Sequence, residues 1–344
     1  MSRNVTVTSI EPNAGIAGGE VMVRLQGVTA AMLPTLSVSF GGAHAHVVSV
    51  NTSRALALVP DAGVDGLVDV ELETFQTRGS SDGNPQFTTG KRLGGNLHPV
   101  ASPAFDPADG SLFVTRSGSR GEHVPTSIYR IDTLGDLEEF SGDITNPTSI
   151  AFDRTGRMFV TSRFDGTVYR ITPDRQVVAF ASDLGIATGL AFNREGYMFV
   201  GDRSGTIFRI NEIGEAKPWA EHEPSVSAYH FAVGPGDNLF VTGPTVSSFD
   251  SITRFDPDGN ASEFFRGLGR PQGLAFDRQG NLYVAAALRG RRGVVRISPD
   301  GKDAELVVAG MNIVGLAFGP ESQMVVATNE AVYSLPLGIE GLLT

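Results

Sequence analysis

A repeated segment constrains this chain more than any other feature. Gly189–Val200 reads GLAFNREGYMFV and Gly273–Val284 reads GLAFDRQGNLYV, so a glycine, an apolar run and a tight turn recur in the same order. In six such copies an aromatic residue, or valine in its place, ends the first strand, and these anchors lie 40 to 47 residues apart: Phe105, Phe152, Phe192, Val233, Phe276 and Phe318. A repeat of this length predicts an array of one supersecondary unit.

Most copies have the pattern of four strands. The first runs into the anchor, the second follows a tight turn (Met198–Val200), the third ends on a motif such as Phe208–Ile210, and the fourth is variable. Such units are typical of propeller blades, so we predict a six-bladed β-propeller over residues 91–344. Ring closure needs a borrowed outermost strand, either from near Phe87–Leu97 or from the tail Leu337–Leu343.

Residues 1–90 show short alternating strands instead. Val5–Ile10 and Glu20–Leu25 alternate apolar and polar residues, which predicts half-buried strands of a β-sandwich. Four motifs in order resemble the IPT/TIG immunoglobulin-like module: Ser9–Gly15, Gly18–Gly19, Val38–Gly42 and Val59–Pro60. The chain is therefore expected to be all-β, with an N-terminal immunoglobulin-like sandwich (1–90) before the six-bladed propeller (91–344).

A second resemblance concerns the repeats. Pro271–Asp277 followed by Gly280–Val284 resembles NHL repeats and the related SMP-30/gluconolactonase propellers. That resemblance implies lactone hydrolysis and a divalent cation such as calcium, held at the channel mouth by carboxylates and amides just before the innermost strands. Here those positions are Ala101, Thr148, Thr188, His230, Gln272 and Val314. None is a carboxylate, whereas calcium sites usually include Asp or Glu, so we predict no metal site or other cofactor.

The same positions predict a polar, nearly uncharged ring at the channel mouth. It consists of Thr148, Thr188, His230 and Gln272, with His98 close by and Asp202 just after its strand. His230 is the candidate catalytic residue, because an imidazole can serve as a general base or bind a ligand near neutral pH. The alternative interpretation is a water-filled channel lined by satisfied polar groups.

Connections between second and third strands are uneven in length. Arg116–Ser127, Thr242–Ser251 and Ala285–Arg292 are longer than their counterparts, whereas the turns between first and second strands are short. We call these two sides of the propeller the loop face and the turn face. Variable loops on a rigid scaffold usually carry recognition, so a protein or small-molecule ligand is expected on the loop face. Arg291 and Arg292 are candidate anion-binding residues there, with a solvated loop as the alternative.

The composition limits the classes of partner and of site that the protein can have. A net charge of -11 argues against a nucleic-acid surface, and the absence of cysteine excludes disulfides and thiolate sites. No apolar run resembles a signal peptide or a membrane span, so we expect no membrane span and a cytoplasmic location if Met1 is the native start.

Two functions stay open. The uneven loops and the ring without carboxylates favour a non-catalytic propeller scaffold that presents its loop face to a ligand or protein. The alternative is a lactonase-like hydrolase or lyase that acts on a sugar lactone or cyclic ester at the channel mouth through His230.

Overall fold

The computed structural model describes residues 5–61, 63–74, 77–79, 85–119, 121–247 and 249–342. Within them the regular elements are β strands, apart from the 3-10 helices η1 (Ala30–Thr35) and η2 (Pro235–Asp237). The all-β class is therefore confirmed. No helix in this part of the chain is long and apolar enough to cross a membrane.

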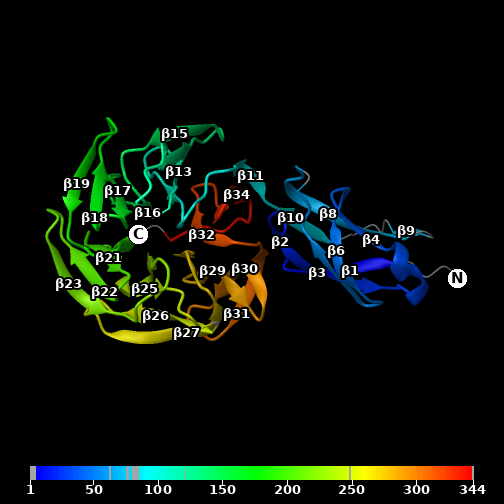
Figure 1. Ribbon diagram of the computed structural model, residues 1–344. Coiled ribbons are helices and arrows are strands. Elements are labelled where there is room, and N and C mark those ends of the chain that lie inside the picture. The colour runs from blue at the N-terminus through cyan, green and yellow to red at the C-terminus, as the bar shows by residue number, and fades with distance from the viewer. Residues whose placement is uncertain are drawn as a thin grey trace.

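Antiparallel blades of four strands form a ring around a central channel (Figure 1). Each blade begins with its innermost strand, as the repeat predicts. The first three blades are β12 (Ala104–Phe105), β13 (Leu112–Thr115), β14 (Ile128–Ile131) and β15 (Leu137–Ser141); β16 (Pro147–Phe152), β17 (Met158–Ser162), β18 (Thr167–Ile171) and β19 (Val177–Ala181); and β20 (Ala187–Phe192), β21 (Met198–Asp202), β22 (Thr206–Ile210) and β23 (Ala216–Glu221).

The ring continues through three more blades. They are β24 (His230–Val233), β25 (Leu239–Thr242), β26 (Asp250–Phe255) and β27 (Ala261–Gly269); β28 (Leu274–Phe276), β29 (Leu282–Leu288), β30 (Arg291–Ile297) and β31 (Ala304–Ala309); and β32 (Ile313–Phe318), β33 (Met324–Thr328) and β34 (Val332–Leu335) with β11 (Lys91–Gly94). Strand β11 pairs with β34, opposite Tyr333 and Ser334, so the segment before the propeller supplies the closing strand. The described part of the tail, the other candidate, makes no strand of this blade up to residue 342.

Aromatic pairs hold neighbouring blades together. The anchor of one blade packs against the aromatic of the second strand in the blade before it: Phe152 lies 5.6 Å from Phe113 and Phe192 lies 5.3 Å from Phe159, between ring centroids. Tilted and edge-on pairs of this kind add to the free energy gained by burying the rings. The recurring anchor is therefore explained by packing between blades.

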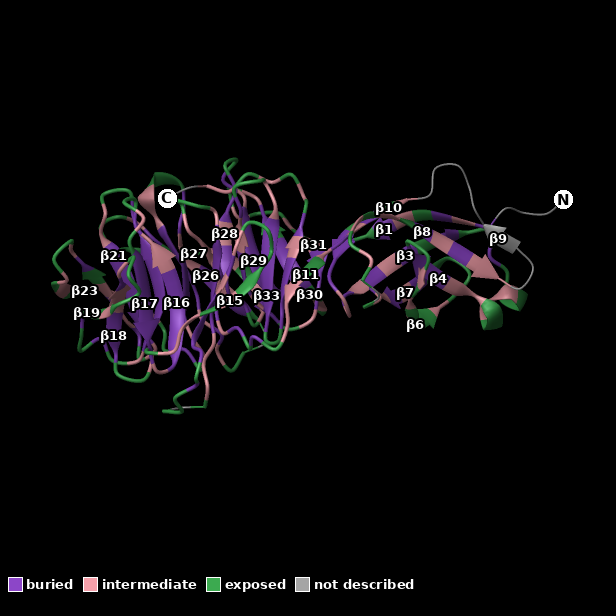
Figure 2. Ribbon diagram, turned by 90° about the horizontal axis from the view of Figure 1, so that it is seen from above, coloured by how far each residue is buried: buried purple, intermediate pink, exposed green. Residues whose placement is uncertain are grey.

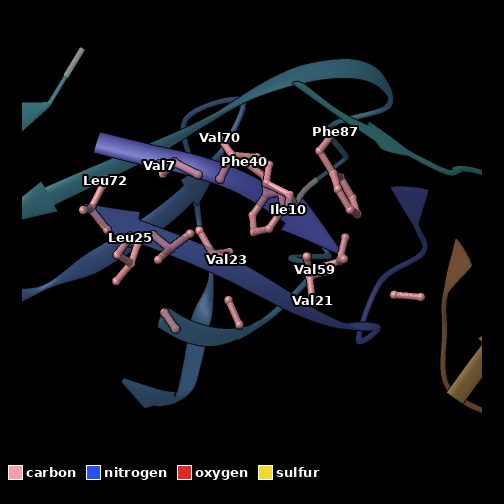
Figure 3. Close-up of a cluster of buried hydrophobic side chains, with 14 of the residues drawn as sticks. Val7, Ile10, Val21, Val23, Leu25, Phe40, Val59, Val70, Leu72 and Phe87 are labelled. Atoms are coloured by element: carbon pink, nitrogen blue, oxygen red, sulfur yellow. The ribbon is translucent and has the colours of Figure 1, made fainter. Parts of the chain in front are cut away.

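The N-terminal strands form two sheets over one apolar cluster. Strands β1 (Thr6–Glu11), β3, β7 and β6 make one sheet, and β4, β5, β8 and β10 lie in the other. Phe40 and Phe87 meet edge to face between them, with ring centroids 4.9 Å apart (Figure 3). The remaining bounds are β2 (Ala14–Gly15), β3 (Glu20–Gln26), β4 (Ser37–Phe40), β5 (Ala43–His44), β6 (His46–Val50), β7 (Arg54–Leu58), β8 (Gly66–Thr74), β9 (Thr77–Gly79) and β10 (Gln86–Thr89). Assignment of these sheets to the IPT/TIG module stays a prediction.

The N-terminal sheets lie beside the ring, against blade five (Figure 2). Gly15 of β2 pairs with Ala309 of β31, and the Ile16 amide donates to the Ala309 carbonyl at 2.9 Å. A side chain at Gly19 would place its Cβ 2.5 Å from the Ala309 carbonyl oxygen, so glycine permits this approach. The Arg291 guanidinium donates to the carbonyls of Glu11 and Glu20.

These contacts correct the loop assigned to Ala285–Arg292. The segment is mostly an extended hairpin of β29 and β30, in which Leu288 pairs with Arg291. Its two-residue turn, Arg289 and Gly290, has φ of 51° and 82°, as the favoured hairpin turn requires. Arg291 therefore belongs to the junction with the N-terminal sheets and not to a free loop.

Candidate functional site

A ring of six alanines lines the central channel. Each blade has alanine directly before its anchor, and in every blade this alanine pairs with the second residue of the second strand: Ala104, Ala151, Ala191, Ala232, Ala275 and Ala317. All six border a cavity of about 540 Å³. Small side chains here let the innermost strands come together while leaving a narrow apolar channel. This repeated alanine is visible in the sequence directly before each anchor, but the predicted ring did not include it.

Contacts between blades crowd the loop-face end of the channel, which we call the closed end. Two residues before each alanine stand Ser102, Ser149, Gly189, His230, Gly273 and Gly315. A Cβ on Gly315 would lie 2.3 Å from Ser102 Cα, and one on Gly273 would lie 2.3 Å from Ser102 Oγ. Blades five, six and one therefore meet almost backbone to backbone. No described residue of the connections between second and third strands borders the cavity.

His230 stands at this closed end, one position away from where the sequence placed it. It pairs with Thr242, and its neighbour Ala232 occupies the alanine ring, so His230 corresponds to Ser149 and not to Thr148. Its side chain borders the cavity and the residue is 4% exposed. It makes no hydrogen bond with the described residues through its ring nitrogens. Burial lowers the pKa of His230 to about 4, so the imidazole is neutral at physiological pH.

The other members of the predicted ring do not border the cavity. Thr148 and Thr188 are buried between blades. Thr115 donates to the Thr148 carbonyl at 2.7 Å, and Thr161 donates to the Thr188 carbonyl at 2.8 Å. In the same way Thr242 donates to the Gln272 carbonyl at 2.6 Å. These positions therefore join successive blades, and the polar ring of Thr148, Thr188, His230 and Gln272 is corrected to a single channel-lining residue, His230.

The remaining candidates lie outside the channel. Asp202 accepts the Ile186 amide at 2.8 Å and the hydroxyl of Ser204, so its carboxylate organises a turn. His98 is exposed on the connection between β11 and β12, with φ of 47°. Arg292 is exposed and its carbonyl accepts the Gly310 amide. None of these side chains is brought to His230.

The turn-face end of the channel is open and carries one cation. Arg154, which follows the anchor of blade two, borders the cavity, and its guanidinium forms no ion pair or hydrogen bond with the described residues. The carboxylate of its neighbour Asp153 is engaged within its own turn. It accepts hydrogen bonds from the Thr155 amide at 2.9 Å and from Arg157 Nε at 2.6 Å. Burial opposes ionisation of Asp153, but these hydrogen bonds hold its pKa below the ordinary value.

The C-terminal segment crosses this open end. The Arg278 amide donates to the Glu340 carbonyl and the Leu342 amide to the Phe276 carbonyl, at 2.9 and 2.8 Å. Gly341 and Leu342 border the cavity. Figure 1 shows the last described residues, in red, running toward the middle of the ring.

On the loop face, large apolar side chains are exposed on two adjoining connections. Val246 and Phe249, between β25 and β26, are 96% and 60% exposed, and Val226, between β23 and β24, is 50% exposed. The two connections touch, since the Val226 amide donates to the Pro244 carbonyl at 3.1 Å. We call Val226, Val246 and Phe249 the apolar patch.

The donor set does not fit a calcium site of the lactonase kind. The closed end offers one imidazole and the hydroxyls of Ser102 and Ser149, whereas calcium takes six to eight oxygen ligands. Among the described residues no three His, Asp or Glu side chains gather as a metal site would require. A second hollow, of about 530 Å³, lies at the outer edge of blades three and four, but its Glu263 carboxylate pairs with Arg266.

Several solved structures have a similar fold. Regucalcin, a calcium-binding protein from Agrobacterium tumefaciens, is 16% identical with a TM-score of 0.59, over 74% of this chain and 95% of its own. A gluconolactonase from Xanthomonas campestris is 15% identical with a TM-score of 0.56, over 71% and 88%. The chain shares the fold of these propellers.

A third neighbour extends over both parts of the molecule. An auxiliary nutrient binding protein from Bacteroides thetaiotaomicron is 12% identical with a TM-score of 0.57, and the match covers 96% of this chain and 97% of that one. No family model matches the sequence, and no curated protein matches it. At these identities the likeness concerns the fold alone.

Proposed function

We propose that this protein is a non-catalytic binding protein whose propeller holds a protein partner on its loop face. The apolar patch carries the proposal. Exposed apolar side chains that gather on one surface are typical of sites for association, whereas single exposed ones are ordinary. Partners of the size of a domain would cover all three side chains, which lie on touching connections.

The patch is held in place by its own connection. Thr245 Oγ1 donates to the Asp250 carboxylate at 2.6 Å, and the Ser247 amide donates to Thr245 Oγ1 at 3.0 Å. Since the connection is braced before binding, less conformational entropy is lost when a partner docks. A nutrient-binding neighbour that covers 96% of the chain also supports a binding role.

Site-specific photocrosslinking tests the proposal. A benzophenone amino acid at Val246 should give one discrete adduct in a lysate of the source organism, and the same group at Ile213 should give none. Ile213 is 75% exposed on the turn between β22 and β23, so it controls for apolar exposure on the turn face. The purified partner should bind Phe249→Asp at least about tenfold more weakly, a loss of about 1.4 kcal/mol, and Ile213→Asp normally. Equal adducts at both positions, or unchanged binding by Phe249→Asp, would exclude the patch.

Lactone hydrolysis is the second candidate, favoured by the likeness to a gluconolactonase and by the free ring nitrogens of His230 at the channel end. Acid release from a panel of lactones, followed at constant pH with added calcium and then with chelator, checks it. Turnover that His230→Ala abolishes would support this alternative. Partner binding at the patch should survive the same substitution.

A further inference from the structure

We propose that the central channel is a second binding site, open at the turn face, for a small apolar monocarboxylate whose charged group binds Arg154 and whose apolar body enters toward His230. The site lies on the opposite side of the propeller from the apolar patch, and its existence does not depend on a protein partner.

The direction of entry follows from what borders the cavity. Its wall reaches the turn face at Pro107 and Arg154 and stops at the level of Ser102 and His230. Gly273 and Gly315 bring their strands into contact with Ser102 at that level, and no described residue of the loop-face connections borders the cavity. The lining therefore favours entry from the turn face.

The wall selects an apolar ligand body. Between its ends the pocket is bordered by the alanine ring and by anchors such as Phe152 and Phe276. A volume of about 540 Å³ falls within the range of pockets that enclose a small organic ligand. Burial of apolar surface stabilises such a complex by about 25 cal/mol per Å².

The opening selects a negative charge. Arg154 borders the mouth, and its guanidinium forms no ion pair or hydrogen bond with a described residue. One of its nitrogens and the Glu212 carboxylate flank Gly196, each 3.7 Å from where a Cβ on that glycine would lie. The nearby Asp153 carboxylate is neutralised by Arg157. In the described part of the tail, up to residue 342, the Glu340 carboxylate is paired with Arg278 at 2.5 Å. Asp106 accepts the Ala108 amide in its own turn. A guanidinium in this setting suits a carboxylate, which it binds through paired hydrogen bonds.

The deep end adds a polar contact. His230 is enclosed, and its ring nitrogens lack a hydrogen bond to the described residues. An imidazole without its charge offers one donor and one acceptor, so a hydroxyl or carbonyl at the far end of the ligand would satisfy it. The ring nitrogens are not among the fully buried unpaired atoms, so they are accessible from the cavity that His230 borders, and a ligand or a bound water can reach them.

Calorimetry with octanoate, dodecanoate and 2-naphthoate tests the site. At least one should bind the wild-type protein, and Arg154→Gln should weaken that binding about tenfold, as expected for loss of a charged contact. Arg194→Gln is the matched control, because Arg194 follows the anchor of blade three in the same way but does not border the cavity. Dodecanol, which lacks the charge, should bind wild type and Arg154→Gln equally.

A spectroscopic readout locates the ligand. On titration with the carboxylate, the imidazole proton resonance of His230, assigned through its loss in His230→Gln, should shift, while that of the exposed His98 should stay. No binding by any of the three carboxylates overturns the proposal. So does binding that Arg154→Gln leaves unchanged, or binding that does not move the His230 resonance.

Discussion

The two ends of the central channel are built from the same repeat and differ in kind. At the loop-face end, Ser102, Gly273 and Gly315 bring three strands into backbone contact. At the turn-face end, the anchors lead into turns, and among the described residues the segment through Gly341 and Leu342 crosses the opening. The loop-face end is crowded by contacts between whole strands, whereas the turn-face end is crossed by a peripheral segment held through a few hydrogen bonds.

This difference separates positions that matter for the stability of the ring from positions that are free to bind a ligand. Groups at the closed end cannot move without shifting whole blades, because interiors are close-packed and respond to the addition of a single methyl group. Groups at the open end can change with little effect on the rest of the ring. Substitutions should therefore have large effects on unfolding at the first end and small ones at the second.

The largest effect is expected at Gly315. In Gly315→Ala the new Cβ would lie 2.3 Å from Ser102 Cα and 2.4 Å from its nitrogen, both backbone atoms that cannot turn aside. We expect a loss of about 3 kcal/mol in the free energy of unfolding, measured by urea denaturation.

Gly290→Ala is the control for this change. Gly290 has φ of 82° and open space around its missing Cβ, so alanine there should cost only about 1 kcal/mol of backbone strain. Equal losses in the two variants would show that the loop-face end is not tightly closed.

The fold was predictable because its cause is local and repeated. Anchors such as Phe152 recur once per blade, and each packs on the blade before it, so spacing alone indicates the ring. The closing strand was predicted only as one of two candidates. Strand β11 pairs with β34 across more than two hundred residues of sequence, and no local pattern in Lys91–Gly94 specifies that partner.

The candidate site was harder to predict, because a shift of one residue in strand register changes which side chains face the channel. Blades two and three carry an irregularity before Ile150 and Leu190, whereas blade four pairs evenly from His230 to Val233. The prediction took the fourth residue before the anchor in blade two, Thr148, but the third in blade four, His230, and so placed these two side by side. A uniform count of three from each anchor aligns His230 with Ser149. The closure by Gly273 and Gly315 depends on distances between blades, which a sequence does not show.

An intermediate effect is expected from the pH dependence of His230. Its pKa of about 4 in the folded protein lies below the ordinary value of 6.5, so protonation favours the unfolded chain. The contribution of the neutral imidazole to the free energy of unfolding is complete above pH 6.5 and is lost as the pH falls toward 4. At pH 5 the loss should be about 2 kcal/mol relative to neutral pH.

The variant His230→Gln isolates this contribution. It cannot titrate, so its unfolding free energy should fall less than that of the wild type between pH 7.5 and pH 5, in urea denaturation at each pH. His98→Gln, at an exposed position, should keep the wild-type dependence. If His230→Gln keeps it as well, the imidazole is open to water and the loop-face end is less enclosed than its packing indicates.

The smallest effect is expected at Glu340 of the open end. Its ion pair with Arg278 is exposed, at 55% and 57% of the two side chains, so Glu340→Gln should cost less than about 1 kcal/mol of global stability. Exchange of the Leu342 amide proton, which is bonded to Phe276, should nevertheless become severalfold faster, because the segment opens without the ring unfolding. Glu263→Gln removes a similar exposed pair at the outer edge and should leave this exchange unchanged. A loss of global stability as large as that of Gly315→Ala would mean that the segment is part of the ring's core, and the contrast between the two ends would fail.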